Sequence, residues 1–304
     1  MNRGNGRKFE KLISRVLIFS LCFSSVISLQ LKSDNIQAKT NSHKTKKEYL
    51  VKVDKNQNIK EIGKHNELEV LDVDINDNQY LVIKSDKKFL ENMEERYDVT
   101  YEEDRVVTAS SNKEIVAKDW NYRQIELNRN KSKRNKNKPV KGRNEKVKVA
   151  VLDSGIDMYG DIDVSESVNF VEDEQDILPV FQDLTGHGTS IAGIIAANKN
   201  DNGITGINPN VELYSVKVFD MNNEAPMSRI IEGINWCVEH NVDIINMSFG
   251  TSRYSEILEE AIRYADKNGI LMIAAAGNRG TVDSKDCIDY PAAYEEVLSV
   301  GSVA

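Results

Sequence analysis

VKVAVLD, residues 147–153, is an almost continuous apolar run that ends in an acid. A strand that is buried on both faces has such a run, whereas a half-buried strand alternates apolar and polar residues. Three later stretches have the same character, LYSVKVF (213–219), VDIINMS (242–248) and ILMIAAA (270–276). Residues 147–153 are therefore predicted to form the first of several strands buried inside a domain.

Helical patterns lie between these strands, over residues 228–240 and 255–269. The second pattern has Ser255 as its predicted N-cap and Gly269 as its C-terminal stop. Apolar strands that alternate with helices are typical of a parallel sheet. The sequence therefore predicts an α/β fold, with a mostly parallel sheet and helices on both of its faces.

The residues before this sheet are of a different kind. Short strand patterns occur at 49–53, 68–75, 80–85 and 98–107, and a helix pattern occurs at 89–97. They predict a small α+β domain, near the lower size limit for independent stability. A strongly basic segment without apolar periodicity, 128–146, comes next. It is either a docking or processing segment or, as we prefer, a solvated loop.

The N-terminus resembles a targeting segment. Five basic residues within residues 3–15 precede the short apolar run 16–29. This order is typical of a secretory signal peptide, whereas a membrane-spanning helix needs about 20 apolar residues. We predict export, with residues 1–38 as the signal peptide and the start of a linker, and no stable membrane span in the mature form. The net charge of −8 argues against a nucleic-acid partner.

Cysteine is scarce, and Cys22 lies inside the predicted signal peptide. Cys237 and Cys287 could form one disulfide in an oxidising compartment, but a chain with so few cysteines is no disulfide scaffold. We expect two separate packing thiols.

Two residues carry the strongest chemical signal. Functional groups of a parallel sheet gather at the carboxyl ends of its strands, and Asp153 closes the first strand. His187 opens an apolar segment, LTGHGTSIAGIIAA (184–197), which predicts a centrally buried helix. A histidine held this way suits a general base, and an acid on its Nδ1 would set the tautomer. The alternatives are a turn-forming aspartate and a satisfied core histidine.

Two further strand ends carry candidate groups. AAAGNRG (274–280) runs into Asn278, whose amide either donates to a developing oxyanion or forms a turn. NMSFG (246–250) offers an exposed strand edge that could pair with an extended peptide. Each signal is weak by itself.

Together, these motifs resemble those of the subtilisin-like serine proteases (subtilase, peptidase S8 family). VAVLDSGID matches the family's aspartate motif, GHGTSIAG its histidine motif, and NMSFG and AAAGN the two walls of its substrate cleft. Residues 290–304 match the family's next segment, in which the bond before the proline, here Pro291, is often cis. Residues 45–110 are similar to the family's inhibitory propeptide, and residues 111–304 to its catalytic domain.

The resemblance implies a serine endopeptidase that is made as a zymogen, with its own propeptide as inhibitor and folding aid. It implies that His187 takes a proton from a serine, that Asp153 supports the imidazolium and that Asn278 holds the oxyanion. An extended peptide or protein substrate would be bound by residues of both walls, namely Ser248, Phe249, Gly250, Ala275, Ala276, Gly277 and Arg279. The chemistry itself would need no cofactor.

One part of the family's pattern is missing. The family's nucleophile lies in a G-T-S-x-A stretch well downstream of YPA, and no such stretch comes after residues 290–292 here. Ser154, Ser190 and Ser248 belong to other motifs. The resemblance therefore implies a chain that lacks the nucleophile, the serine-bearing helix and the last strands, and that is inactive as given. The alternative function is a non-catalytic peptide-binding remnant. A nucleotide-binding domain is disfavoured, because the strand-to-helix turns carry no glycine-rich phosphate motif.

NKNDNGITG (198–206) comes directly after the histidine helix, where the family often builds a calcium loop. The resemblance implies oxygen ligands from the Asn200 side chain and from the main chain of Asn198, Asn202 and Ile204, although a polar turn needs no metal.

Two finer expectations concern substrates. Arg279 would lie near the mouth of the pocket for P1, the residue before the cleaved bond, and would disfavour Lys or Arg there while tolerating Glu or Gln. The alternative is a solvated arginine. The short catalytic core with signal and propeptide also resembles the lantibiotic leader peptidases that Gram-positive bacteria secrete, the alternative being a general secreted protease.

Overall fold

The computed structural model describes residues 46–56, 67–97, 99–109, 146–158, 161–175, 179, 182–198, 204–280 and 287–302. They all belong to one of the two units into which the chain divides, Lys46–Ala304. The predicted signal peptide and the basic segment up to residue 145 lie outside these residues. Among the helices that the structure describes, none is both long and apolar enough to cross a bilayer.

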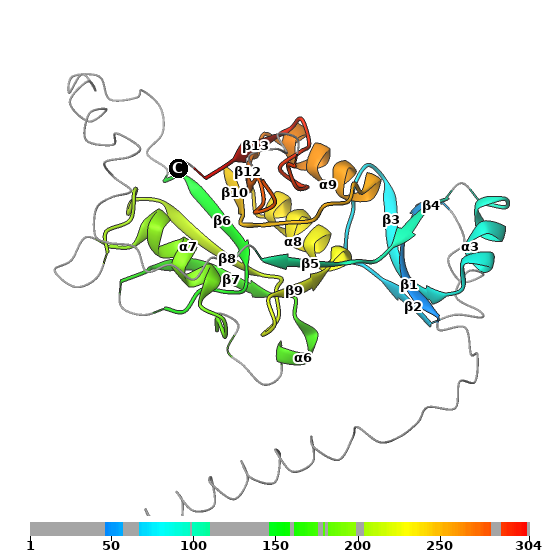
Figure 1. Cartoon of the computed structure of the whole chain (residues 1–304), viewed down its shortest axis with the longest axis horizontal. Coiled ribbons are helices and arrows are strands. Elements are labelled where there is room, and N and C mark those ends of the chain that lie inside the picture. Colours follow the sequence, from blue (N-terminus) through cyan, green and yellow to red (C-terminus); the bar gives the residue numbers. More distant parts are fainter. Residues whose placement is uncertain are drawn as a thin grey trace, which may run out of the picture. The chain divides into compact units, whose positions relative to one another are not determined.

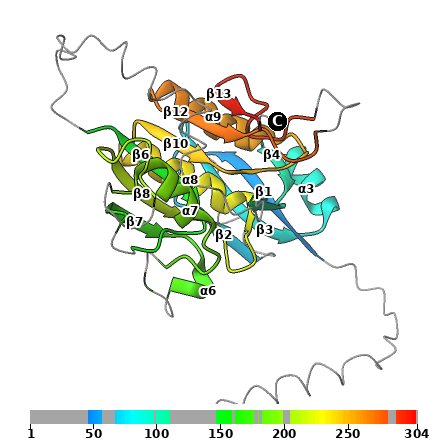
Figure 2. The same ribbon diagram turned by 60° about the vertical axis from the view of Figure 1, so that its left-hand side comes forward.

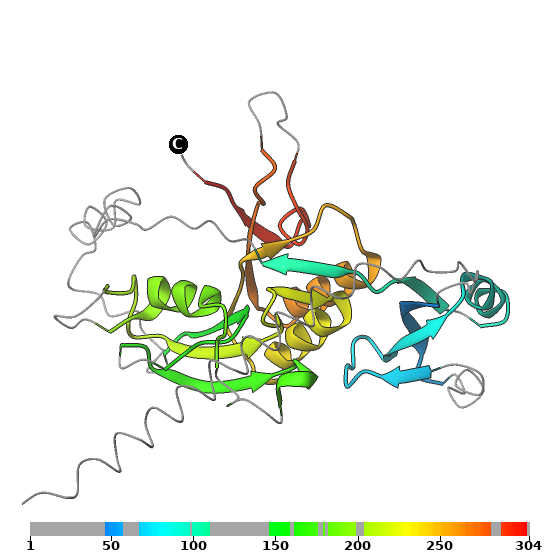
Figure 3. The same cartoon turned by 60° about the horizontal axis from the view of Figure 1, so that its bottom comes forward.

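The large sheet has six parallel strands in the order β13-β12-β10-β6-β8-β7. The strands are β6 (Lys148–Asp153), β7 (Val164–Asn169), β8 (Glu212–Lys217), β10 (Ile244–Met247), β12 (Leu271–Ala275) and β13 (Val297–Val300). The four inner strands are those that the apolar runs predict. The two outer strands, β7 and β13 (red in Figure 3), pair on one side only. The predicted α/β fold is thus confirmed.

Five helices are described: α3 (Lys87–Glu94), α6 (Glu172–Gln175), α7 (His187–Ala196), α8 (Met227–Glu239) and α9 (Glu256–Lys267). Helix α9 begins and ends where the sequence predicts. Ser255 Oγ accepts a hydrogen bond from Leu258 N at 3.0 Å, and Gly269 has a φ of 80° just after the last turn.

The central strand β6 explains why its sequence is apolar throughout. Val149 and Val151 pack in the same cluster as Ala192 of α7, whereas Ala150 and Leu152 pack in the cluster that contains α8 and α9. Successive side chains of a strand point to opposite faces, so helices cover both faces of the sheet (Figure 1).

Helix α7 is less buried than its sequence suggests. Ala192 and Ala196 are buried, but Ile194 is 44% exposed and Ser190 is exposed as well. The expectation of a centrally buried helix is therefore corrected, because the described residues cover only one side of α7.

The small α+β module, residues 46–109, is a four-stranded antiparallel sheet in the order β2-β3-β1-β4. Its strands are β1 (Lys47–Asp54), β2 (Glu67–Val70), β3 (Asn78–Ser85) and β4 (Val99–Glu103). Helix α3 lies against one face of this sheet (Figure 2), and its Leu90 and Met93 pack in a cluster with side chains of that face. Leu50 and Tyr80, on the opposite face, belong to the same core cluster as Ile234 of α8. The two sheets therefore share a hydrophobic core.

Residues 98–107 are predicted as one strand, but the structure divides them at Asp104 and Arg105. The second part, β5 (Val106–Ala109), lies between β11 (Phe249–Gly250) and β9 (Glu224–Pro226) and pairs antiparallel with both (Figure 1). At the break, the Asp104 carboxylate accepts hydrogen bonds from Ser228 N at 3.1 Å and Ser228 Oγ at 2.7 Å. The chain therefore leaves one sheet to complete another.

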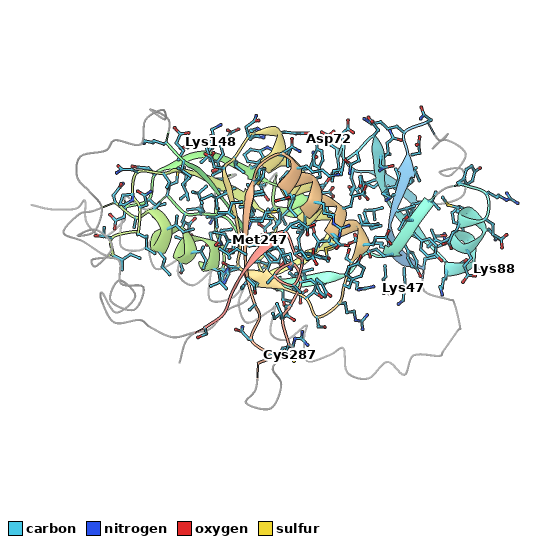
Figure 4. All side chains as sticks on the ribbon, turned by 90° about the horizontal axis from the view of Figure 1, so that it is seen from above. Lys47, Asp72, Lys88, Lys148, Met247 and Cys287 are labelled. Carbon is cyan, nitrogen blue, oxygen red and sulfur yellow. The ribbon has the colours of Figure 1, made fainter. Side chains whose placement is uncertain are left out.

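The interior is densely filled around the end of β10, where Met247 is almost fully buried (Figure 4). Cys237 is buried in the same core cluster and Cys287 is partly exposed, and both thiols are free. The expectation of two separate thiols is confirmed. Burial raises the pKa of the Cys237 thiol.

Candidate active site

Asp153 is the last residue of β6 and is fully buried at the carboxyl edge of the sheet. The turn that comes next depends on Gly155, whose φ is 107°, a value that side chains disfavour. A Cβ at Gly155 would also lie 2.9 Å from the carbonyl oxygen of Gln182. The sequence Asp-Ser-Gly therefore lets the strand end abruptly against the loop that leads to His187.

His187 is the first residue of α7, and its Nδ1 lies 2.7 Å from Asp153 Oδ1. The helix approaches the end of β6 this closely because its second residue is Gly188. A Cβ there would lie 2.2 Å from the carbonyl oxygen of Gly155. Ser154 N also donates to Asp153 Oδ1, at 2.8 Å. The structure thus brings together the acid and the imidazole that the sequence predicts as partners.

Asp183 organises the loop that carries His187. One of its carboxylate oxygens accepts from Gly186 N at 2.9 Å and Ser154 Oγ at 2.9 Å, and the other from Thr189 N at 2.9 Å and Thr189 Oγ1 at 2.7 Å. Burial of Asp183 opposes ionisation, but these hydrogen bonds outweigh it and lower the pKa of the carboxyl below its usual range. Sequence reasoning missed Asp183, although an acid three or four residues before a predicted site residue is a signal that could have found it.

A buried ion pair, Lys217–Glu174, also supports the turn after β6. Lys217, at the end of β8, is fully buried, and its Nζ lies 3.1 Å from Glu174 Oε2. The same Nζ donates to the carbonyl oxygens of Ser154 at 2.7 Å and Phe219 at 3.2 Å. The charge is thus satisfied by backbone groups next to Asp153, which fixes the turn. The sequence analysis did not anticipate either residue.

The two predicted cleft walls lie at the same edge of the sheet as Asp153, because β6, β10 and β12 are parallel and all end there. Phe249 and Gly250 form β11, whose edge pairs with β5, so this edge does hold an extended segment. Ser248 precedes β11, and its Oγ accepts from the Asn246 amide at 2.9 Å.

Ala275 ends β12 on the other wall, and Ala276 N donates to the carbonyl oxygen of Val300 at 2.8 Å. Gly277 is next with a φ of 94°, and Asn278 is exposed just beyond it. Asn278 therefore lies beyond the carboxyl end of β12. In the sheet, β10 is the one strand between β12 and β6.

Arg279 does not carry an unpaired charge. Its Nε donates to Asp289 Oδ1 at 2.8 Å, and its Nη2 forms a second, shorter bond to the same oxygen. The prediction that Arg279 disfavours basic substrates therefore loses its premise, because the sequence analysis did not foresee Asp289. The peptide bond before Pro291 is cis, as the resemblance implies.

The serines that belong to other motifs are engaged elsewhere. Ser154 Oγ donates to Asp183 and accepts from Gly188 N at 3.0 Å, and Ser190 Oγ donates to the carbonyl oxygen of Gly186 at 2.7 Å. With Ser248 bound to Asn246, each of the three has a structural partner.

Only two of the four predicted calcium ligands lie in the described part of the chain. The Asn198 amide donates to Asp163 Oδ2 at 2.9 Å, and the Ile204 side chain is half exposed. Asn200 and Asn202 lie outside the described residues. Within these residues, no group of three or more acidic, histidine or cysteine side chains could hold a metal.

The Subtilase family model matches residues 144–304. Subtilisin amylosacchariticus of Bacillus subtilis subsp. amylosacchariticus is 42% identical over 158 residues, which are 52% of this chain and 41% of that relative. The major intracellular serine protease of Bacillus subtilis (strain 168) is 44% identical over 170 residues, 54% of this chain and 53% of its own length. Minor extracellular protease Epr, from the same strain, is 32% identical over 229 residues, 73% of this chain and 34% of its own length. The chain thus spans about a third to a half of these relatives.

Proposed function

Since the chain belongs to the subtilase family, we propose that it forms the Asp–His and substrate-binding part of a serine endopeptidase, which hydrolyses peptide bonds. The observation that carries this proposal is the 2.7 Å contact between Asp153 Oδ1 and His187 Nδ1 at the carboxyl edge of the sheet. A buried carboxylate on Nδ1 keeps the proton there, so that Nε2 is the basic nitrogen. It also stabilises the imidazolium that forms when His187 accepts a proton from a serine hydroxyl.

Asn278 is proposed as the oxyanion donor. It stands at the end of the wall that begins with β12, on the same sheet edge as Asp153. An exposed side-chain amide at that edge can donate to the negative charge that develops on the carbonyl oxygen during attack. We assign the nucleophile to a serine other than Ser154, Ser190 and Ser248, because each of these has a structural partner.

Fluorophosphonate labelling tests this proposal, because the reagent bonds only to an activated serine. We expect no labelling of the 304-residue chain. We expect labelling of a chain that continues beyond Ala304 with the C-terminal part of Subtilisin amylosacchariticus, and its loss in the His187→Ala variant. Labelling of the 304-residue chain would overturn our assignment of the nucleophile. An unlabelled, folded chimera would overturn the proposed function.

The second candidate function is a peptide-binding remnant that does not cleave. It is supported by the pairing of β5 with β11, because an extended strand is held at this edge. Under this alternative, the 304-residue chain retains peptides intact, and the natural reading frame supplies no downstream serine. The nucleotide sequence after codon 304 distinguishes the two functions.

We propose that residues 45–110 act as an inhibitory propeptide of residues 111–304, so that the protein is made as a zymogen. Strand β5 supports this role because it occupies the edge that a substrate would use. Two acids that precede β5 in the chain also contact the large sheet module, the part of residues 146–302 that the structure describes, since Asp104 binds Ser228 and Glu102 binds Ser255. Excess peptide of residues 45–110 should inhibit the chimera, and deletion of these residues should remove the block.

The same proposal extends to export and to a substrate. We propose that residues 1–38 direct secretion from a Gram-positive bacterium, and that the substrate is an extended protein segment such as a lantibiotic leader peptide. Support for this is limited to the basic-then-apolar order of the N-terminus and to the extracellular protease among the relatives. Cleavage of a precursor peptide only at the leader boundary would support the narrower substrate, whereas general casein hydrolysis would contradict it.

A structural calcium ion remains a proposal for the loop 198–206. Two of the proposed main-chain ligands, Asn198 and Ile204, lie near the two ends of this loop in the sequence, and calcium prefers oxygen ligands. Bound calcium would fix the loop after α7. Thermal unfolding in EDTA and in calcium tests this, and equal melting temperatures would contradict it.

A further inference from the structure

Asp289 is a buried acid that lies between the two proposed walls of the peptide cleft. Its backbone N–H donates to the carbonyl oxygen of Ala276 at 3.0 Å, which ties it to one wall. A Cβ at Gly277 would lie 2.1 Å from Asp289 Oδ2, and a Cβ at Gly250, on the other wall, would lie 2.7 Å from Asp289 Cβ. Both walls therefore carry glycine where they meet this side chain.

Strand β5 shows which side chains of a bound peptide face Asp289. Thr108 pairs with Gly250 and Ala109 with Phe249. Residues that are directly opposite in an antiparallel pair project to the same face, so Thr108 projects to the face on which a Gly250 Cβ would meet Asp289. Every second residue of a strand projects to the same face, so the residue that follows the Ala109 position projects to the same face as Thr108. A peptide that pairs with β11 in the register of β5 thus places the side chain after the Ala109 position on the same face as the Asp289 carboxylate.

The ion pair at Asp289 is open to solvent on the Arg279 side. The Asp289 side chain is 11% exposed, whereas that of Arg279 is 48% exposed. Both Arg279 bonds end on Oδ1, and within the described residues Oδ2 accepts no hydrogen bond. Loss of Arg279 alone would leave a buried carboxylate without its cation, which is costly, so the guanidinium moves into solvent only as another cation takes its place. The carboxylate cannot move in the same way, because it is held between backbone segments.

We propose that Asp289 is a specificity-determining residue that selects a lysine or arginine side chain at the position after Ala109 in the β5 register, the P1 position. Arg279 occupies the carboxylate until a substrate cation replaces it. A neutral or acidic substrate side chain leaves the Arg279–Asp289 pair in place and gains no charged partner. This inference rests on the proposed function and reverses the preference expected from Arg279 alone.

The test measures binding of fluorescent peptides Val-Thr-Ala-X to the full chain by anisotropy, with X as Arg, Leu or Glu. The first three residues copy Val107–Ala109, and β5 competes with all three peptides alike, so the ratio of affinities does not depend on it. We expect the Arg peptide to bind at least about tenfold more tightly than the Leu and Glu peptides. The ratio should fall to about one in Asp289→Asn and Asp289→Gly, and should rise in Arg279→Gln.

A second ion pair of similar exposure provides the matched control. Arg263 of α9 binds Glu296, which directly precedes β13, and their side chains are 53% and 19% exposed. Arg263→Gln and Glu296→Gln make the same charge changes and should leave the ratio unaltered. An Arg preference that persists in both folded Asp289 variants would overturn the inference alone. Failure of all three peptides to bind even after deletion of residues 45–110, which removes β5 from the edge, would contradict the proposed peptide cleft, and with it the inference.

Discussion

A single buried carboxylate, Asp183, holds the loop that positions His187. It accepts hydrogen bonds from main-chain and side-chain donors on both sides of the histidine. These donors belong to the loop and to the first turn of α7, whereas Asp153 bonds to the imidazole itself. Asp183 is therefore a positioning residue, which acts through the loop and the first turn of α7.

We predict that Asp183→Asn lowers the free energy of unfolding by about 3 kcal/mol, because an amide cannot replace a charged acceptor of several hydrogen bonds. Urea denaturation measures this loss. Asp86→Asn is the control, because Asp86 caps α3 with one exposed bond to Phe89 N, and its loss should cost less than about 1 kcal/mol. Equal losses in the two variants would contradict the role of Asp183.

The pKa of Asp183 also predicts a dependence on pH. Its hydrogen bonds lower the pKa of the carboxyl in the folded chain. The folded chain therefore holds fewer protons than the unfolded chain in acid, and the contribution of Asp183 is complete above the unfolded value of about 4. It is lost as the pH falls through the folded pKa. In Asp183→Asn, the free energy of unfolding should therefore depend less on pH in acid. An unchanged dependence on pH would contradict the lowered pKa of Asp183.

At the scale of elements, α7 can deliver His187 to Asp153 only because its first turn packs directly on the turn after β6. Gly188 makes this contact, whereas Gly193, in the same helix, faces the flexible end of Ile204 at 3.3 Å. The two glycines therefore form a matched pair within one helix.

We predict that Gly188→Ala destabilises the protein by about 1–3 kcal/mol, since the new Cβ would overlap a backbone oxygen that cannot move aside. Gly193→Ala should be neutral or stabilising by up to about 1 kcal/mol, because alanine is the better helix former. Thermal unfolding of both variants provides the measurement. A larger loss of thermal stability in Gly193→Ala than in Gly188→Ala would contradict the role of the close contact between Gly188 and the turn after β6.

Helix α8 is capped by another segment of the chain. Pro226 stands at its N-cap position and offers no side-chain acceptor, but Asp104 accepts from both donors of Ser228. We predict that Asp104→Ala costs about 1 kcal/mol and loosens β5 from its two neighbours, because the bond is made across modules. Hydrogen exchange of the Val107 and Ala109 amides reports this loosening. Unchanged protection would show that β5 is held by its strand pairing alone.

At the scale of the whole molecule, acids from both modules meet at a cavity of about 160 Å³. Glu48, Glu69 and Asp104 line it from the small α+β module, and Glu172 and Glu232 from the large sheet module. Arg229 is the cation among its lining residues. Burial and the neighbouring carboxylates of Glu69, Glu172 and Asp72, opposed by Arg229, raise the pKa of Glu232 to about 7.

This raised pKa predicts that the assembled molecule loses stability as the pH rises. Between the unfolded pKa of about 4.3 and the folded value, the folded chain keeps a proton that the unfolded chain has released. Stability should therefore fall from about pH 4.5 to pH 7, and Glu232→Gln should reduce this fall. Melting temperatures across that range test it, with Glu295→Gln as a control. A fall that persists unchanged in Glu232→Gln would contradict the assignment.

The sequence by itself determined the four inner strands of the large sheet and both ends of α9. Buried parallel strands leave continuous apolar runs, and caps leave Ser255 and Gly269 at fixed places. It also singled out Asp153 and His187, because local motifs carry them and because strand ends collect functional groups. These signals involve residues that are neighbours in the sequence, so they can be recognised without the tertiary structure.

The tertiary structure alone decided which distant residues become neighbours. The Lys217–Glu174 pair supports the site through a contact between residues that are distant in the sequence, and no local pattern marks either of them. Arg279 looked like a free charge until Asp289 was brought beside it. The pattern 98–107 looked like one strand because propensity does not reveal that β5 must cross to β11. Electrostatics and pairing depend on distance in space, which sequence spacing does not fix.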